Sequence, residues 1–207
     1  MPVKKIDFKK EFGRLYFPSA KEVVAIDVPD MNFAMVDGEG DPNTSREYRD
    51  AREALFGASY AVKFALKLGG VADFKVAPLE GLWWSAKGAE AFAAGGRKDD
   101  WEWISMIMQP DVVSQDRFQA VVSQLREKKD WPALSRIRLE RFHEGSSAQV
   151  LYVGPYAAEG PTIERIHAFI RDRGWRLTGR HHEIYLSDPR KTPQERLRTV
   201  IRQPFSK

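Results

Sequence analysis

The chain repeats one structural plan twice, and this degenerate duplication restricts its fold more than any single motif does. Residues 23–42 alternate as a strand, a Pro-Asp turn and a second strand, which ends near Gly38 in a polar loop. Residues 139–161 follow the same plan, with Gly154 where the first copy has Gly38. The sequence therefore predicts two similar halves, each beginning with a pair of strands.

Each polar loop leads into a helix with recognisable start and stop signals. Thr44 or Ser45, followed by Glu47, precedes a helix predicted over 48–68, and Pro161 with Glu164 opens a second one that Gly174 ends. Two more strands follow each helix, at 79–86 and 101–110 in the first half and at 181–188 and 196–204 in the second. The last strands end in the nearly identical motifs IMQP and IRQP.

The remaining segments complete a fold prediction. Apolar residues recur at helical spacing in 111–130, which predicts a linking helix over about 112–130, and 87–100 is predicted to be a long hairpin loop. We expect one domain over 1–207, with repeat 1 at about 22–110 and repeat 2 at about 136–205. The expected class is α+β, with duplicated β-α-β-β modules, antiparallel sheets and pseudo-two-fold symmetry around a ligand groove.

Composition excludes several kinds of protein. The 207 residues are 43% hydrophobic and 30% charged, which is ordinary for a globular domain, and no apolar stretch approaches membrane-spanning length. A cytoplasmic protein without membrane association is expected. The chain has no cysteine and its four histidines lack a metal-ligand spacing, so we expect no metal and no cofactor.

The positive net charge does not by itself indicate nucleic-acid binding. The formal charge is +4, but acidic residues interrupt the basic ones even in the C-terminal stretch from Arg190 to Arg202. No helix-turn-helix, zinc-finger or RNP pattern accompanies this charge. We therefore expect a solvated basic surface and no direct contact with nucleic acid.

The segment HHEIYLSD at 181–188 contains the most distinctive acidic residue. In a strand, His181, Glu183 and Tyr185 share one face, so the carboxylate lies beside an aromatic ring. Aligning the halves matches Trp83 with Tyr185 and Gly81 with Glu183. Two interpretations remain open: Glu183 reaches solvent or pairs with an arginine such as Arg180 or Arg198, or it marks a ligand pocket.

Aromatic residues supply candidate walls for such a pocket. Trp83 is expected on the face equivalent to that of Tyr185, while Trp101 and Trp103 share one face of their strand. Met106 falls on the opposite face from Trp103 and suits either a core or an adaptable pocket. Tyr60 lies in the first long helix and is a weaker candidate, and the tryptophans could equally build a core.

These motifs together resemble the GyrI-like family, which is related to DNA gyrase inhibitor proteins and to the drug-sensing domains of multidrug-responsive regulators. The resemblance runs from about residue 20 to the end and rests on HHEIYLSD, VLYVGPY, ASYAVKFALK, LWW and WEWISMIMQPD in consistent order. It implies a pair of β-α-β-β modules around a groove that binds flat aromatic molecules. The sequence lacks the regulators' DNA-binding domain and coiled coil, which argues against a transcription factor.

The resemblance also implies a chemistry. Some stand-alone relatives hydrolyse cyclopropane-bearing DNA-alkylating compounds, and Glu183 matches the family's pocket glutamate, which would act as a general base. A tyrosine hydroxyl would stabilise the developing phenolate, with Tyr152, Tyr156 and Tyr185 as candidates. We assign catalysis to Glu183 and Tyr152, and ligand binding to Trp83, Trp101, Trp103, Met106, Tyr156, Tyr185 and Tyr60. The alternative is a non-catalytic drug-binding protein or, less favoured, a DNA gyrase modulator.

Overall fold

The computed structural model describes residues 4–85 and 97–207, and part of the predicted loop 87–100 lies outside these residues. Within this part of the chain, nine strands form one large sheet and two more form a short parallel pair. The sheet contains β2 (Val24–Val28), β3 (Met31–Glu39), β5 (Leu79–Ser85), β6 (Trp101–Gln109), β7 (Arg138–Phe142), β8 (Gly145–Val153), β9 (Arg176–Leu177), β10 (His181–Tyr185) and β11 (Arg198–Ser206). The parallel pair is β1 (Lys4–Ile6) with β4 (Ala72–Phe74). The predicted α+β class with an antiparallel sheet is confirmed.

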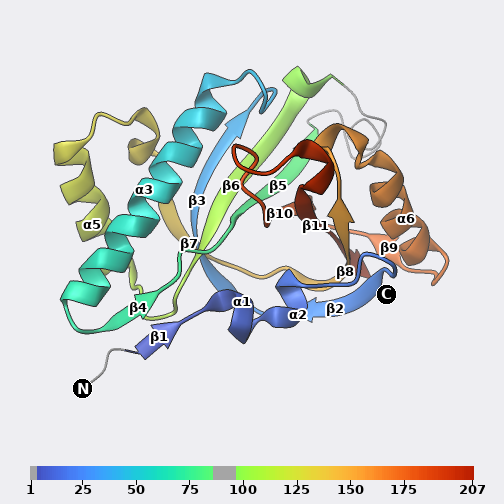
Figure 1. Cartoon of the computed structure of the whole chain (residues 1–207), viewed down its shortest axis with the longest axis horizontal. Coiled ribbons are helices and arrows are strands. Elements are labelled where there is room, and N and C mark those ends of the chain that lie inside the picture. Colours follow the sequence, from blue (N-terminus) through green and yellow to red (C-terminus); the bar gives the residue numbers. More distant parts are fainter. Residues whose placement is uncertain (1–3, 86–96) are drawn as a thin grey trace.

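The helices lie on both sides of the sheet. Over residues 4–85 and 97–207 they are α1 (Phe8–Glu11), α2 (Gly13–Tyr16), α3 (Arg46–Leu68), α5 (Gln115–Lys128) and α6 (Gly160–Arg171), with four 3-10 turns, η1 (Lys98–Asp100), η2 (Pro132–Ser135), η3 (Tyr156–Ala158) and η4 (Gln194–Arg196). Helices α3 and α6 lie towards opposite ends of the sheet, with α5 beside α3 (Figure 1). The Ser45 hydroxyl caps α3 by accepting from the Tyr48 N–H at 3.2 Å, which satisfies one free donor at the helix start.

The strand order supports the proposed duplication. The main path runs β2-β8-β11-β10-β5-β6-β3-β7. In the proposed halves, β2, β3, β5 and β6 correspond to β7, β8, β10 and β11. Replacing each strand by its counterpart gives the same path read in the opposite direction. The pairing register also agrees, because Asn32 faces Gln109 in β3–β6 and Ala148 faces Gln203 in β8–β11, as the Gly38/Gly154 and IMQP/IRQP matches require.

The central pair of strands departs from the expected alignment by two residues. Leu79 faces Ile107 in the first half, whereas Glu183 faces the corresponding Ile201 in the second. The register therefore matches Glu183 with Leu79, while Gly81 is its direct cross-strand neighbour. A two-residue slip keeps every side chain on the same face of a strand, so the alternation pattern of the sequence cannot detect it.

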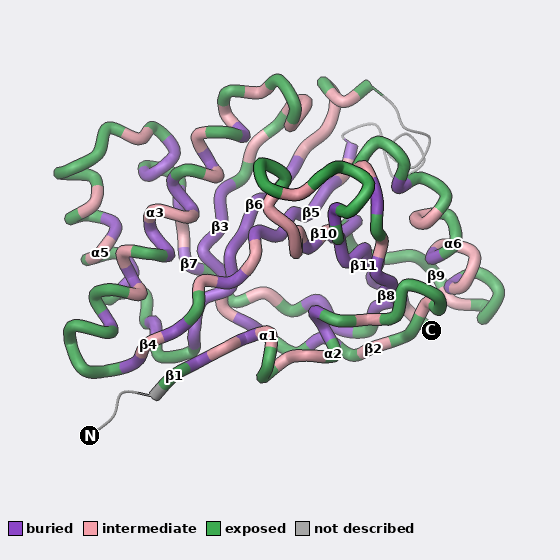
Figure 2. The backbone as a smooth tube through the Cα atoms, in the orientation of Figure 1, coloured by how far each residue is buried: buried purple, intermediate pink, exposed green. Residues whose placement is uncertain are grey.

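The two faces of the sheet are covered differently. On one face, α3 packs over β3 and β6, and α6 packs over β8 and β11. On the other face lie the N-terminal helices, where Tyr16 and Leu15 bond to side chains of β5 and β11. Most residues of the central strands are buried (Figure 2). Among the described residues, no helix is both long and apolar enough to cross a bilayer.

Candidate functional site

The face of the sheet beneath α3 and α6 carries a row of aromatic side chains around Glu183. Tyr185 on β10 accepts a hydrogen bond from Trp83 Nε1 on β5 at 3.0 Å. Trp83 in turn packs edge to face with Trp101 of β6, with ring centroids 5.8 Å apart. The row spans three adjacent strands, because Trp83 faces both His181 and Trp103 in the sheet register.

Glu183 lies inside this row and does not reach out to solvent. Its side chain is 14% exposed, and its Oε1 lies 3.1 Å from His181 Nε2. Opposite it stands Gly81, where an added Cβ would come within 2.6 Å of Trp83 Nε1. The glycine thus lets the Trp83 ring lie over the strand. The alternative pairing with Arg180 is not seen, since that guanidinium stacks on Trp84 at 3.8 Å.

The sequence interpretation missed a second carboxyl, Glu159, at the start of α6. Only 4% of Glu159 is exposed, and burial followed by repulsion from Glu183 raises its pKa to about 10. For Glu183, burial opposes ionisation, but hydrogen bonding and charge from His181 outweigh it and lower the pKa. Two carboxyls in this relation share one proton. Near neutral pH, Glu183 is the ionised member and Glu159 the protonated one.

Tyr48 on α3 is the second residue that the sequence interpretation missed. Its ring lies 5.6 Å from that of Trp83 and 5.1 Å from that of Trp103. Burial raises the pKa of Tyr48 well above its usual value, while Arg52, one helical turn later and 5.7 Å from the ring, opposes this shift. Tyr48 is therefore a phenol that keeps its proton, beside a cation and near the carboxyl pair.

The other predicted tyrosines have different positions. Tyr156 on η3 packs edge to face against Tyr185 at 5.6 Å, and burial with the charge of Glu159 raises its pKa to about 12. Tyr152 lies on the same face of the sheet, but its hydroxyl donates to the Pro155 carbonyl at 2.9 Å. That bond anchors the turn before α6.

Two residues predicted to contact the ligand, Met106 and Tyr60, do not lie beside Glu183. Met106 lies on the opposite face of the sheet, where its neighbours in the register are Glu80 and Met35. Tyr60 is 48% exposed on the outer side of α3, away from the buried residues of that helix. Both belong to elements that contribute to the site, but strand alternation and helical phase turn these two side chains away from Glu183.

Several buried polar atoms of this face have no hydrogen-bond partner among the described residues. They include Trp103 Nε1, Ser105 Oγ and Glu159 Oε1. Buried polar atoms in folded proteins are nearly always paired, so a group of exceptions indicates a place where a ligand or water completes the bonding. Within the described residues, no cluster of three acidic or histidine side chains has the geometry to hold a metal ion.

Comparison with known proteins identifies the family of this chain. Residues 21–205 match the GyrI-like small molecule binding domain, and the chain therefore belongs to that family. The family predicted from the sequence motifs is confirmed. No curated protein matches the chain.

Similar solved structures fall into two groups. Two structures described as a hydrolase from Listeria innocua are 40% and 39% identical to this chain, with TM-scores of 0.85 and 0.86. They cover 97% and 98% of this chain, which covers 100% of each of them. The EcmrR C-terminal domain has a TM-score of 0.57 over 90% of this chain and 98% of its own, but at 12% identity it shows a shared fold only.

Proposed function

We propose that this protein hydrolyses cyclopropane-bearing, DNA-alkylating aromatic compounds by adding one water molecule. The observation that carries the proposal is the buried carboxyl pair of Glu183 and Glu159 inside an aromatic row, with the ionised and protonated members already distinct. The 40% identity to a protein described as a hydrolase supports an enzyme. The aromatic row supports a flat substrate, because ring pairs add about 0.5–1.5 kcal/mol beyond their buried area.

The proposed step needs one base and one acid. Glu183 accepts a proton from water while the water oxygen bonds to a cyclopropane carbon. The ring C–C bond breaks, and its electron pair passes through the conjugated system to become a phenolate. The proton of Glu159 then neutralises that phenolate. The products are the ring-opened alcohol and phenol, and proton exchange with solvent restores the pair.

Tyr48 is the tyrosine that we propose for stabilising the phenolate, in place of Tyr152. The Tyr152 hydroxyl proton is already donated to the Pro155 carbonyl, whereas Tyr48 lies among Trp83, Trp103 and Arg52. A hydroxyl donor preorganised in a buried site stabilises developing negative charge more strongly than water does. Arg52 would add a positive charge on the same side.

The decisive test is incubation of the purified protein with a cyclopropane-bearing alkylator, followed by mass spectrometry of the product. Wild type should add one water, and Glu183→Gln should slow this by roughly 10²–10⁴-fold, the usual contribution of a general base. Quenching of tryptophan fluorescence should show that the variant still binds the compound. Glu195→Gln, at an exposed glutamate, is the matched control.

Retention of full activity in Glu183→Gln would refute the assigned base. Binding without any water addition by the wild type would instead support the alternative function, a protein that sequesters aromatic drugs, which the small-molecule-binding family also accommodates. Inhibition of DNA supercoiling by the intact protein, without binding of the alkylator, would favour the gyrase modulator.

A further inference from the structure

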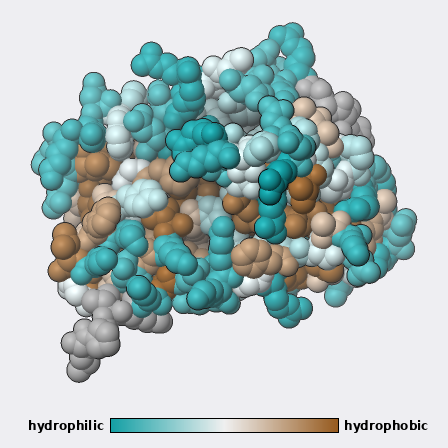
Figure 3. Space-filling view, viewed as in Figure 1, coloured by the Kyte–Doolittle hydropathy of each residue, from teal (hydrophilic) through white to brown (hydrophobic). Residues whose placement is uncertain are grey.

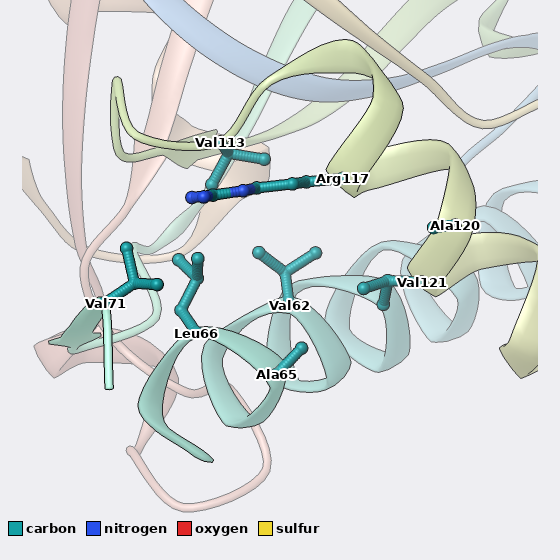
Figure 4. Close-up of a pocket in the computed structure, with 8 residues that line it drawn as sticks. All are labelled: Val62, Ala65, Leu66, Val71, Val113, Arg117, Ala120 and Val121. Atoms are coloured by element: carbon teal, nitrogen blue, oxygen red, sulfur yellow. The ribbon is translucent and has the colours of Figure 1, made fainter. Parts of the chain in front are cut away.

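Two surface hollows lie away from the aromatic row around Glu183, and they differ in volume. The first, between α3 and α5, has a volume of about 240 Å³ and is lined almost entirely by aliphatic side chains, with Arg117 across it (Figure 4). The second, beside α1 and α2, measures about 430 Å³. Small-molecule sites occupy roughly 300–1,000 Å³, so only the second is large enough.

The second hollow has an apolar lining. Phe8 and Phe17 contribute from the N-terminal segment, and the residues between β4 and β5 contribute Val76, Ala77 and Pro78. Phe17 is 52% exposed although Phe8 beside it is buried. The face that carries α1 and α2 shows hydrophobic patches interrupted by hydrophilic side chains (Figure 3). An apolar ligand body would cover surface that is now exposed to water.

The charges around the hollow are mainly positive. Lys9, Lys10 and Lys75 line it, against the single carboxylate of Asp7. Asp7 already pairs with Lys75, at 2.7 Å between Oδ2 and Nζ. Among the described residues, no carboxylate lies within ion-pair distance of Lys9, which is only partly exposed. Burial and then the nearby Arg198 lower the pKa of Lys9.

We propose that this hollow is a second binding site, for a small anion with an apolar body, such as an aliphatic or aromatic carboxylate. The anionic group would pair with Lys9, and the apolar body would lie against Phe17 and Val76. The ligand would give the half-buried ammonium of Lys9, which lies beside other cations, a negative partner that the described residues do not provide. The ionised carboxylate of Glu183 would repel the same ligand, so we expect the anion at this hollow and not at the first site.

The test uses decanoate below its micelle concentration, with binding measured by isothermal titration calorimetry. Wild type should bind it, and Lys9→Gln should bind about tenfold more weakly or worse, because it loses the charge but keeps most of the side-chain length. Lys21→Gln, at an exposed lysine outside the hollow, is the matched control and should bind like the wild type. Thermal unfolding of each variant checks that the fold is intact.

Further arms separate this site from the first one. Glu183→Gln should leave decanoate binding unchanged, and decyltrimethylammonium should not compete. Failure of the wild type to bind decanoate, or equal binding by Lys9→Gln, would overturn the proposal. A change in decanoate binding in Glu183→Gln, in either direction, would also overturn it, by placing the anion at the other site. Cosedimentation with phosphatidylglycerol vesicles without decanoate binding would point to a lipid surface and would contradict a small-molecule site.

Discussion

The two faces of β10 carry ionisable residues that lie largely inside the protein but are paired very differently. On the face beneath α3 and α6, Glu183 shares a proton with Glu159, and neighbouring polar atoms lack partners within the described residues. On the other face, His182 lies between two carboxylates, with its Nδ1 2.9 Å from Glu144 and its Nε2 3.0 Å from Glu80. Burial alone therefore does not identify a functional acid.

The paired network on the second face is complete. Arg202 donates to Glu144 at 2.8 Å, to Gln149 at 3.0 Å and to the Leu15 carbonyl at 3.1 Å. The Tyr16 hydroxyl donates to the remaining oxygen of Glu80 at 3.1 Å. With every charge matched, this network holds the N-terminal helices against the sheet. The face with unmatched groups is the one that we assign to chemistry.

The largest expected effect on stability comes from breaking the paired face. Arg202→Met should lower the free energy of unfolding by about 3–5 kcal/mol, because it leaves Glu144 buried with less compensating charge. Urea denaturation followed by far-ultraviolet circular dichroism measures this. A loss below about 1 kcal/mol would show that the network contributes little. Arg196→Met, at an exposed arginine near the start of the same strand, is the control.

The paired face should also make stability depend on pH. Burial favours neutral His182, but the charge of the Glu144 carboxylate is the largest of the effects that outweigh burial and raise the pKa of His182 to about 9. The charges of His182 and Arg202 likewise outweigh burial at Glu144 and lower its pKa to about 2. The stabilisation from His182, about 3 kcal/mol, is complete below its unfolded pKa near 6.5 and disappears as the pH rises through 9. That from Glu144 is complete above about 4.5 and disappears towards pH 2.

The contribution of the paired face to stability should therefore be highest between about pH 4.5 and 6.5. Denaturation midpoints measured from pH 3 to pH 10 test this window. A curve in His182→Gln that still falls between pH 6.5 and 9 with the wild-type slope would assign the loss to another group.

The effect expected from the unmatched face has the opposite sign. A carboxyl whose pKa is raised in the folded state keeps its proton there while the unfolded chain ionises. Such a group lowers the free energy of unfolding as the pH rises above the unfolded pKa of about 4.5. Glu159→Gln keeps the neutral shape and removes this loss, so at pH 8 it should raise the free energy of unfolding by at least about 1 kcal/mol, or 2–4 °C in Tm, and the gain should shrink as the pH falls to 4. Differential scanning calorimetry at pH 8 and pH 4 measures it. Equal Tm changes at both pH values would argue against a shared proton.

Much of the fold could be predicted, because hydrophobic alternation and turn residues act locally. The repeated strand–helix–strand order and the antiparallel class follow from such signals. The N-terminal helices α1 and α2 were not predicted, since each is a single turn long and depends on tertiary contacts such as those of Leu15 and Tyr16. A helix of that length is too short to be stable by itself.

The site was predictable to the extent that it lies on strands. Alternation places Glu183 with Tyr185 on one face, and Trp83 with Trp103 follows from the same rule in neighbouring strands. Glu159 and Tyr48 lie on helices from different halves, and only the packing of α3 and α6 on the sheet brings them near Glu183. A weak signal existed for Glu159, an acid just before Pro161 at a helix start.

The alternation of β10 has a further consequence for how this family can vary. Inserting or deleting one residue in the strand would turn His182 towards Tyr48 and Glu183 towards Arg202, which would disrupt both faces at once. Changes of two residues avoid this, because they leave each side chain of the strand on its present face. The length of this strand is therefore expected to change among relatives in even steps only, a parity rule that sequence comparison can check.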